Sequence, residues 1–502
     1  MNEYDVIVVG TGVAGLVSAL TALKNGKKVL LLEKNNRVGG TASIHRKGRF
    51  EFRNYLSFYL NNNSNDLYRS KRILASLGVE MPNTYKIPEL YKMISPNGVI
   101  ELPANKEEMI QRITEIYPDS FESLNTFFAL ATECREALEY ISNNADWDYE
   151  EIRENYNNFM RVSNYSISQV LDTIGMPVAV QELINVYWLL LGSSETEISF
   201  VTYAVIFLNA LEYGLVSTKN GEYEIIARLL DKYLELGGLL KLNGEVIRII
   251  IEDNKVNGVK LLDGSTYYTR NLIVNSNMET VFSKLVNPEE VPREVFTNIN
   301  SRISGGRLFT VNLGLNRDYK SLGLKDYLTF IYKSLDSDVE LTKLKEIAWG
   351  DQIAIVPNVA IKDASPEGTC ILSLNTVYFG DIFSEYTDRN NYYRDINEIA
   401  QRLIQVFEKF TGINISEYIE EIEIISPVDN SITTGSINGN TYGFMLSGLD
   451  NTLPKMMNKD NEKYVDGLRV IGGFNGDLFM YESALYNGYS NTIDSLKEIV
   501  GE

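Results

Sequence analysis

A short stretch near the N-terminus constrains the fold of this chain more than any other feature. The apolar run Val6–Val9 has the length of a strand and leads into Gly10-x-Gly12-x-x-Gly15, and a helix-compatible segment, Val13–Lys24, follows. In such units the first glycine makes the tight turn, the second lets the backbone approach a pyrophosphate, and the third lets the helix pack on the strand. The N–H groups that open the helix face the phosphates. The pattern predicts a dinucleotide site rather than a merely structural turn.

A second apolar strand, residues 28–33, follows after a turn at Asn25 and Gly26. It ends in Glu33, eighteen residues after Gly15, where a carboxylate can accept hydrogen bonds from an adenosine ribose. We therefore expect the dinucleotide to contact this acid and the glycine turn, through Gly10, Gly12, Val13, Ala14, Gly15 and Glu33.

The residues after Glu33 indicate which dinucleotide binds. Residues 34–41 read Lys-Asn-Asn-Arg-Val-Gly-Gly-Thr, which resembles the Arg-x-Gly-Gly motif that follows the acid in flavoproteins of the glutathione-reductase superfamily. The resemblance implies FAD as the cofactor, and a glycine-rich surface loop is the alternative. It adds five expected contacts, namely Lys34, Arg37, Gly39, Gly40 and Thr41.

The composition argues against several other classes of protein. A net charge of −20 disfavours nucleic acid or an anionic membrane surface as a partner. Cys134 and Cys370 lie far apart, which fits a reducing compartment and leaves no Cys-x-x-Cys pair for a redox relay or a metal. The single histidine, His45, argues against a histidine-based metal centre or a Ser-His-Asp triad. Because the first strand begins near Tyr4, we expect no signal peptide and a cytoplasmic protein.

The middle of the chain changes character twice. Residues 66–216 are mostly helical in pattern, and their dense apolar stretches at 187–192 and 203–208 form either a tunnel for an apolar substrate or plain core. An amphipathic helix, a Gly-Gly turn and β-hairpins follow over residues 217–300. Residues 301–425 combine strands with one amphipathic helix that ends at Gly412.

The helix, Gly-Gly turn and strand around Val246 resemble the segment by which this flavoprotein superfamily re-enters the FAD domain, where the residue at Val246 contacts the adenine. The resemblance implies an α/β fold, with a Rossmann-like FAD-binding domain of the glutathione-reductase type and a discontinuous α+β substrate domain. The expected segments are residues 1–65, 217–300 and 426–502 for the FAD-binding domain, 66–216 for a helical substrate or cap region, and 301–425 for a substrate domain of β-sheet plus helix.

The C-terminal segment is similar to the closing motif of flavin amine oxidases and phytoene desaturases. A strand ends in two glycines at 472 and 473, and residues 481–488 open the last helix. Backbone N–H groups there stabilise negative charge on a flavin as it is reduced. Residues 439–443 resemble the Gly-x-x-Tyr-Gly segment that returns the chain to the flavin. The resemblance implies cofactor contacts at Gly473, Asp477, Ser483 and Ala484, and places Tyr442 and Glu482 beside the ring as candidate catalytic residues.

Two residues need a separate interpretation. In phytoene desaturase-like proteins an aromatic strand ends in Asp-x-Gly close to the flavin, whereas here Arg53 aligns with the aspartate and Tyr55 with the glycine. Arg53 is a third candidate catalytic residue, which holds a substrate carboxylate or a cofactor phosphate unless it is an exposed strand arginine. His45 is an acid/base, a flavin tether or an ordinary polar strand residue.

The order of these motifs along the whole chain resembles the superfamily of phytoene desaturases, carotenoid isomerases and flavin amine oxidases. Since no cysteine lies near the closing motif and no second Gly-x-Gly-x-x-Gly occurs, we expect non-covalent FAD and no NAD(P) domain. The resemblance implies an oxidoreductase that dehydrogenates or isomerises C–C bonds of an apolar or polyene-like small molecule. Its electron acceptor is oxygen, a quinone or none, and weak peripheral membrane contact follows from the family alone. The alternatives are a flavin amine or amino-acid oxidase, or a non-catalytic binding protein resembling the Rab GDP-dissociation inhibitors.

Overall fold

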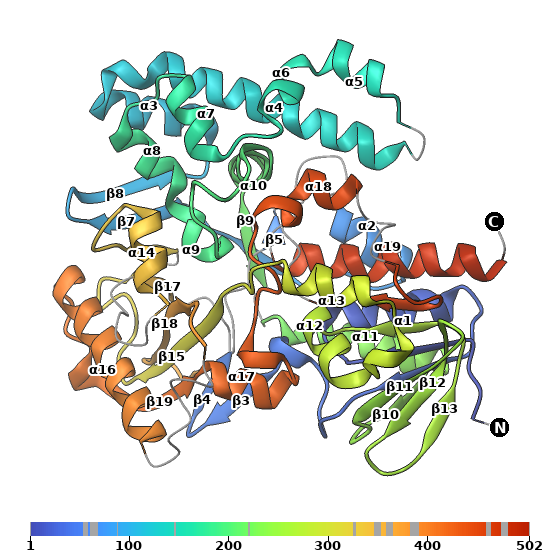
Figure 1. Ribbon diagram of the computed structural model, residues 1–502. Coiled ribbons are helices and arrows are strands. Elements are labelled where there is room, and N and C mark those ends of the chain that lie inside the picture. Colours follow the sequence, from blue (N-terminus) through green and yellow to red (C-terminus); the bar gives the residue numbers. More distant parts are fainter. Residues whose placement is uncertain are drawn as a thin grey trace.

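The computed structural model describes residues 2–53, 59–60, 69–87, 89–144, 147–218, 221–324, 328–345, 353–357, 365–381, 391–457, 463–472 and 480–500. Figure 1 shows three parts: helices at the top, a sheet flanked by a long helix at the lower left, and an α/β part with both chain ends at the lower right.

The α/β part is built on a parallel sheet whose strands come from both ends and the middle of the chain. Their spatial order is β10 (Leu239–Lys241), β2 (Val29–Leu32), β1 (Val6–Val9), β14 (Leu272–Val274) and β20 (Leu468–Val470). β1 lies in the centre, where Ile7 pairs with Leu30 on one side and Leu272 on the other. A central parallel sheet entered from remote segments is the Rossmann-like arrangement, so the predicted fold class is confirmed.

The two faces of this sheet have different covers. Because successive strand residues point to opposite faces, Val6 and Val8 pack with helices while Ile7 packs against a second sheet. The helices are α1 (Val13–Lys24), α11 (Tyr223–Glu235) and α19 (Met480–Val500), with α2 (Arg69–Ser76) beside α19. The second sheet is antiparallel and consists of β11 (Val246–Glu252), β12 (Lys255–Leu261) and β13 (Thr266–Tyr268).

A seven-stranded sheet forms the second part. Its order is β19 (Ile419–Ile425), β15 (Arg307–Leu315), β18 (Cys370–Tyr378), β17 (Ile353–Pro357), β16 (Thr329–Ile331), β7 (Glu89–Ser95) and β8 (Gly98–Pro103). The predicted amphipathic helix is α16 (Tyr392–Thr411), which packs on this sheet and ends at Gly412 with φ of 71°. β7 and β8 come from the segment with the mostly helical pattern, which sequence periodicity alone did not assign to the sheet.

The helical part consists of α3 (Lys106–Ile116), α4 (Phe121–Asn143), α5 (Tyr149–Asn155), α6 (Asn157–Val162), α7 (Ile167–Thr173), α8 (Val178–Ile184), α9 (Trp188–Leu191) and α10 (Phe200–Tyr213). The two apolar stretches noted in the sequence belong to its core, since α10 is buried from Phe200 to Leu211 and Tyr187 is fully buried. Among the described residues, the helices lack the combination of length and apolarity that a bilayer crossing requires.

Buried tyrosines connect this core to the seven-stranded sheet. The hydroxyl of Tyr187 donates to the carbonyl oxygen of Leu90 at 3.1 Å, and that of Tyr332 donates to Val186 at 2.6 Å. Burial raises the pKa of both phenols well above 10. They therefore act as neutral donors that satisfy backbone carbonyls inside an apolar core, which explains part of the abundance of tyrosine in the sequence.

A hairpin joins the α/β part to the seven-stranded sheet. It consists of β3 (Ile44–Lys47) and β4 (Phe50–Arg53), and Lys47 Nζ donates to the carbonyl oxygen of Ile422 in β19 at 2.6 Å. A Cβ at Gly314 of β15 would lie 2.5 Å from the Phe50 ring, so the hairpin packs directly on the backbone of that strand. Three short strands, β5 (Tyr59–Leu60), β9 (Leu215–Thr218) and β6 (Thr84–Lys86), form a further small sheet.

The remaining helices lie between these parts or at their edges. They are α12 (Met278–Thr280), α13 (Arg293–Asn300), α14 (Ser337–Lys343), α17 (Pro427–Thr434) and α18 (Thr452–Met457).

Replacing Gly15 with alanine should destabilise the protein strongly. A Cβ at this position would lie 2.0 Å from the carbonyl oxygen of Gly10, so α1 would have to move off β1. We expect a loss of at least about 2 kcal/mol, the usual scale of overpacking, visible as a lower midpoint of thermal unfolding. Gly26→Ala is the control, because nothing lies within 4 Å of its Cβ position and only its φ of 74° opposes the change, at about 1 kcal/mol. Equal midpoints for the two variants would contradict this account.

Candidate functional site

A cleft of about 300 Å³ opens where the carboxyl ends of β1, β2, β14 and β20 meet the start of α1. This edge is where open α/β sheets bind their ligands. Segments from the N-terminus, the middle and the C-terminus of the chain contribute to it. Its lining consists of residues 9–14, 33–35, Gly40, Thr41, 244–246, 274–277, Thr280, Lys284, Leu285, Asn430, 433–436, Asn440, Thr441, Ile471, Gly472, Tyr481 and Ala484.

The glycine turn leaves the backbone bare on the side of the cleft. Gly10 has φ of 95°, and a Cβ at Gly12 would lie 2.7 Å from Nδ2 of Asn275. A Cβ at Gly40 would lie 3.4 Å from Cα of Gly12, so the second glycine motif passes directly beside the first. Two backbones at this spacing, with no side chains between them, form a cradle that suits a diphosphate.

The start of α1 points into this cradle. Gly12 occupies the N-cap position without any side-chain cap, and no acidic residue lies in the first turn. The first N–H groups of a helix have no partner within the helix, and its N-terminus carries partial positive charge. Val13 and Ala14, whose N–H groups belong to this turn, both line the cleft. The turn therefore fits the pyrophosphate of a dinucleotide.

Glu33 is fixed at the end of β2 by two neighbours. Its Oε2 accepts hydrogen bonds from the backbone N–H of Thr11, at 3.1 Å, and from the Thr11 hydroxyl. Its Oε1 accepts from the backbone N–H of Asn35 at 2.9 Å and from the Asn35 side chain at 3.0 Å. The side chain is 5% exposed and lines the cleft. These four donors occupy the lone-pair sites of the carboxylate, so a ribose hydroxyl would have to share or displace one of them, such as the Asn35 side chain or the Thr11 hydroxyl.

Two lysines of the cleft lining bind backbone carbonyls near the end of α17. Lys34 donates from Nζ to the carbonyl oxygen of Ile432 at 2.6 Å, and Lys284 donates to Gly435 at 3.1 Å. Both carbonyls belong to the end of α17 or to the residue that follows it. Burial lowers the pKa of Lys34, while Glu245 and Glu33 oppose this effect. The lysines thus hold residues 433–436 against the cleft, whose lining includes all four.

The structure places many, but not all, of the predicted cofactor contacts in the cleft. Those in its lining are Gly10, Gly12, Val13, Ala14, Glu33, Lys34, Gly40, Thr41, Val246 and Ala484. Gly15 and Gly39 shape the turn from behind, since Gly15 packs on Gly10 and the N–H of Gly39 donates to the carbonyl oxygen of Thr11 at 3.2 Å. Gly473 and Asp477 lie outside the described residues, as does Tyr55.

Other predicted residues point away from the cleft lining. Nη2 of Arg37 lies 2.9 Å from Nε2 of His45. Oε1 of Glu482 accepts a hydrogen bond from the hydroxyl of Ser70 in α2 at 2.9 Å, and Ser483 receives one from Asn487 at 3.4 Å. On α19 it is Tyr481 and Ala484, three residues apart and so on one face, that line the cleft.

Tyr442 lies at the boundary between the cleft and the helical core. Its neighbour Thr441 lines the cleft, while its own ring is buried and lies 3.5 Å from the Cβ position of Gly192. The predicted Gly-x-x-Tyr-Gly segment therefore does reach the site, and it carries the chain from the cleft into the apolar core.

Arg53 is buried and not an exposed strand arginine. Its side chain is 4% exposed, and Nη1 donates to Oε2 of Glu222 at 2.8 Å. Nε and Nη2 make no hydrogen bond within the described part of the chain. A Cβ at Gly221 would lie 1.8 Å from Nη2, so the guanidinium lies against the backbone that opens α11.

Sequence reasoning missed two groups of lining residues. Asn275, Ser276 and Asn277 follow β14, and they could have been found because polar residues after a parallel strand reach the same edge as Glu33. Residues 433–436 gave no such signal, since only the packing of α17 brings them over the cleft.

Comparisons with known proteins agree with this geometry. Residues 5–62 match the family of FAD dependent oxidoreductases. The chain is 24% identical over 486 residues to a chloroplastic prolycopene isomerase of Daucus carota, covering 94% of this chain and 76% of that protein. It is 22% identical over 354 residues to a 4,4'-diapophytoene desaturase of Methylomonas sp, covering 67% of each.

A solved structure of a redesigned putrescine oxidase has the same fold. Its TM-score is 0.65 at 13% identity, and the match covers 98% of this chain and 99% of that one. The glycine cradle and the fixed Glu33 fit a dinucleotide, and the family match identifies that dinucleotide as FAD. The chain belongs to the superfamily of FAD-dependent oxidoreductases, and FAD is its cofactor.

Proposed function

We propose that this protein dehydrogenates or isomerises C–C bonds of an apolar, polyene-like small molecule with FAD. The observation that carries the proposal is that a prolycopene isomerase matches 94% of this chain, a length that includes both the dinucleotide cleft and the seven-stranded sheet. The amine oxidase likeness rests on the fold, at 13% identity. Desaturation therefore has better support than amine oxidation.

FAD, when bound, supplies the site that accepts a hydride from a substrate carbon. We propose that the turn from Gly10 to Ala14 and the residues Gly40 and Thr41 hold its diphosphate, and that Glu33 holds its ribose. Val246 then lies at the adenine. These contacts need no covalent link.

Beside Thr441 of the cleft lining, the neighbours of Tyr442 suit an apolar substrate. This tyrosine belongs to the same buried cluster as the apolar residues of α9 and α10. A hydrocarbon chain that reaches the cleft past Tyr442 would leave water and meet mainly apolar side chains. We propose that Tyr442 orients the substrate there, and that Arg53, through the N–H groups of Nε and Nη2, holds a polar end of the substrate or of the cofactor.

The remaining roles are proposals of the same kind. Glu482 directly follows Tyr481, which lines the cleft. We propose that Glu482 fixes the start of α19 by accepting the hydrogen bond from the Ser70 hydroxyl in α2.

We propose oxygen or a quinone as the electron acceptor for desaturation and none for isomerisation. We also propose a cytoplasmic location, with weak contact to a membrane that carries the apolar substrate.

Glu33→Gln should weaken FAD binding about tenfold to a hundredfold. The amide would replace one acceptor oxygen with a donor facing the N–H groups of Thr11 or Asn35, and it would lose the charge that strengthens the bonds to the ribose. FAD fluorescence, followed during titration of the apoprotein, measures the dissociation constant. Glu235→Gln, whose side chain is 65% exposed, should leave that constant unchanged. An unchanged constant in Glu33→Gln would remove Glu33 from the cofactor site.

Anaerobic incubation with a panel of polyenes, fatty acids and amines tests the reaction itself. We expect a polyene either to bleach the flavin absorbance and yield a product two hydrogens lighter, or to yield a product of equal mass with a shifted absorption spectrum. Mass spectrometry and absorption spectroscopy check both outcomes. Bleaching of the flavin by an amine with release of ammonia, followed by hydrogen peroxide once oxygen is admitted, and with no change in any polyene, would instead show an amine oxidase.

A further inference from the structure

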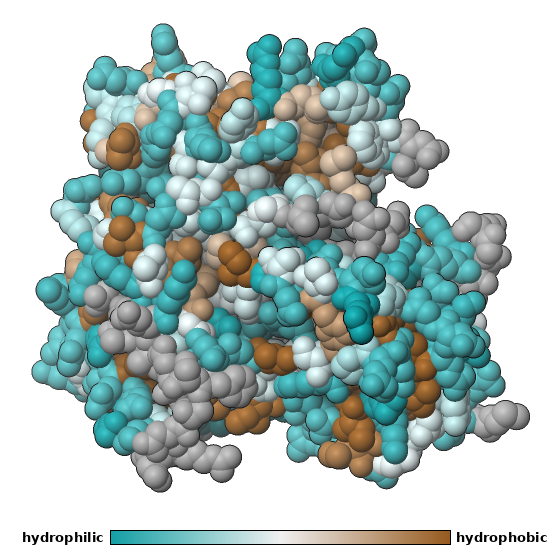
Figure 2. Space-filling model, in the orientation of Figure 1, coloured by the Kyte–Doolittle hydropathy of each residue, from teal (hydrophilic) through white to brown (hydrophobic). Residues whose placement is uncertain are grey.

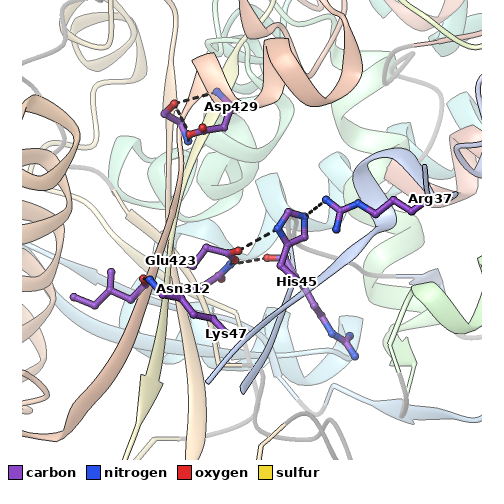
Figure 3. Close-up of polar contacts among 9 residues, drawn as sticks. Arg37, His45, Lys47, Asn312, Glu423 and Asp429 are labelled. Atoms are coloured by element: carbon purple, nitrogen blue, oxygen red, sulfur yellow. Dashed lines mark hydrogen bonds and ion pairs between the residues drawn. The ribbon is translucent and has the colours of Figure 1, made fainter. Parts of the chain in front are cut away.

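His45 lies between two charged side chains from different parts of the molecule. The imidazole belongs to β3, and Figure 3 shows it between Arg37 and Glu423. Nε2 lies 2.9 Å from Nη2 of Arg37, and Nδ1 lies 3.2 Å from Oε1 of Glu423 in β19. The ring therefore connects the loop that carries the second glycine motif to the edge strand of the seven-stranded sheet.

These contacts determine the protonation state of the ring. A guanidinium has only donors, so Nε2 must accept the hydrogen bond from Arg37 and cannot carry a proton. The proton of the neutral ring is then on Nδ1, which donates to the carboxylate of Glu423. The arrangement fits the neutral imidazole, because a proton on Nε2 would place two cationic donors against each other.

The connection continues beyond Glu423 into the sheet. Nδ2 of Asn312 donates to Oε2 of Glu423 at 3.1 Å and to the carbonyl oxygen of Arg53 at 2.7 Å, and Figure 3 shows Asn312 beside Glu423. Oδ1 of Asn312 accepts from the hydroxyl of Ser373 at 2.6 Å. Glu423 is thus held by a residue in the interior of the sheet, which makes it a firm anchor for His45.

The other charges of the hairpin have partners of their own. Arg46 pairs with Glu51 at 3.1 Å, and Lys47 donates to the carbonyl oxygen of Ile422. Across the hairpin His45 faces Phe52, which carries no charge. The charged groups that face the ring are therefore Arg37 from the loop and Glu423 from β19.

We propose that His45 is a positioning residue for FAD: when neutral it ties the loop of residues 37–41 to the seven-stranded sheet, and its protonation releases Arg37 and weakens FAD binding. Gly40 and Thr41, three and four residues after Arg37, line the cleft, so a loose loop costs cofactor contacts. This inference goes beyond the proposed reaction and depends only on FAD as the cofactor.

The sign of the pH effect follows from the tautomer. FAD binds best to the form with neutral His45, so its affinity should be higher at pH 8 than at pH 5.5. One hydrogen bond is lost, which corresponds to about a twofold to tenfold higher dissociation constant at pH 5.5.

The test is a fluorescence titration of the apoprotein with FAD at pH 5.5 and pH 8. His45→Gln is the decisive variant, because its amide can accept from Arg37 and donate to Glu423 but does not titrate. We expect the pH ratio of the dissociation constants to vanish in His45→Gln, with affinity close to that of the unchanged protein at pH 8. His45→Ala should bind weakly at both pH values. A His45→Gln variant with the same pH ratio as the unchanged protein would overturn the proposal.

Two controls separate His45 from other causes. Burial raises the pKa of Glu195 in the helical part to about 7, so this carboxyl titrates in the same range. Glu195→Gln should keep the pH ratio, and its loss there would assign the effect to Glu195 and overturn the proposal. Failure to bind FAD at any pH would remove the cofactor assignment as well, whereas FAD binding without reaction on polyenes would remove only the proposed reaction.

Discussion

The close approach of α1 to β1 is the contact on which the rest of the structure depends. With a Cβ at Gly15 only 2.0 Å from the Gly10 carbonyl oxygen, the helix can start where it does only because that side chain is absent. This approach aims the bare N–H groups of the first turn at the space beyond the sheet. The remaining walls of the cleft, from Glu33 to Ala484, are placed around that point.

The parts of this arrangement that could be predicted are those encoded in local chemistry. The strand, glycine turn, helix and acid of the first 33 residues follow one another without interruption, so the cofactor class and the fold class could be inferred from them. Val246 lines the cleft, and the helix, Gly-Gly turn and strand around it form one recognisable unit, so its contact with the adenine stays a prediction. Gly412 was predicted as a helix end because its left-handed conformation is one that glycine adopts readily.

The features that could not be predicted depend on orientation and on distant packing. A motif match locates residues 481–484 in the chain but not the rotation of their helix, so Ala484 reaches the cleft while Glu482 meets Ser70. Arg37 occupies a cofactor motif, yet its guanidinium turns to His45 because β19 brings Glu423 to the other side of that ring. Similarly, β7 and β8 join the seven-stranded sheet through pairing with β16, which no local pattern specifies.

The order of the five parallel strands has a consequence for how the protein is made. β20 and α19 close one side of the sheet and cover α1, yet they follow the other four strands of that sheet in chain order and so are synthesised after them. The apolar surface of α1 therefore stays open while most of the chain is synthesised, and in that period it is a surface for chaperones or for aggregation. FAD can be enclosed only once β20 and α19 have been synthesised, so the supply of free cofactor acts after the other strands of the sheet are in place.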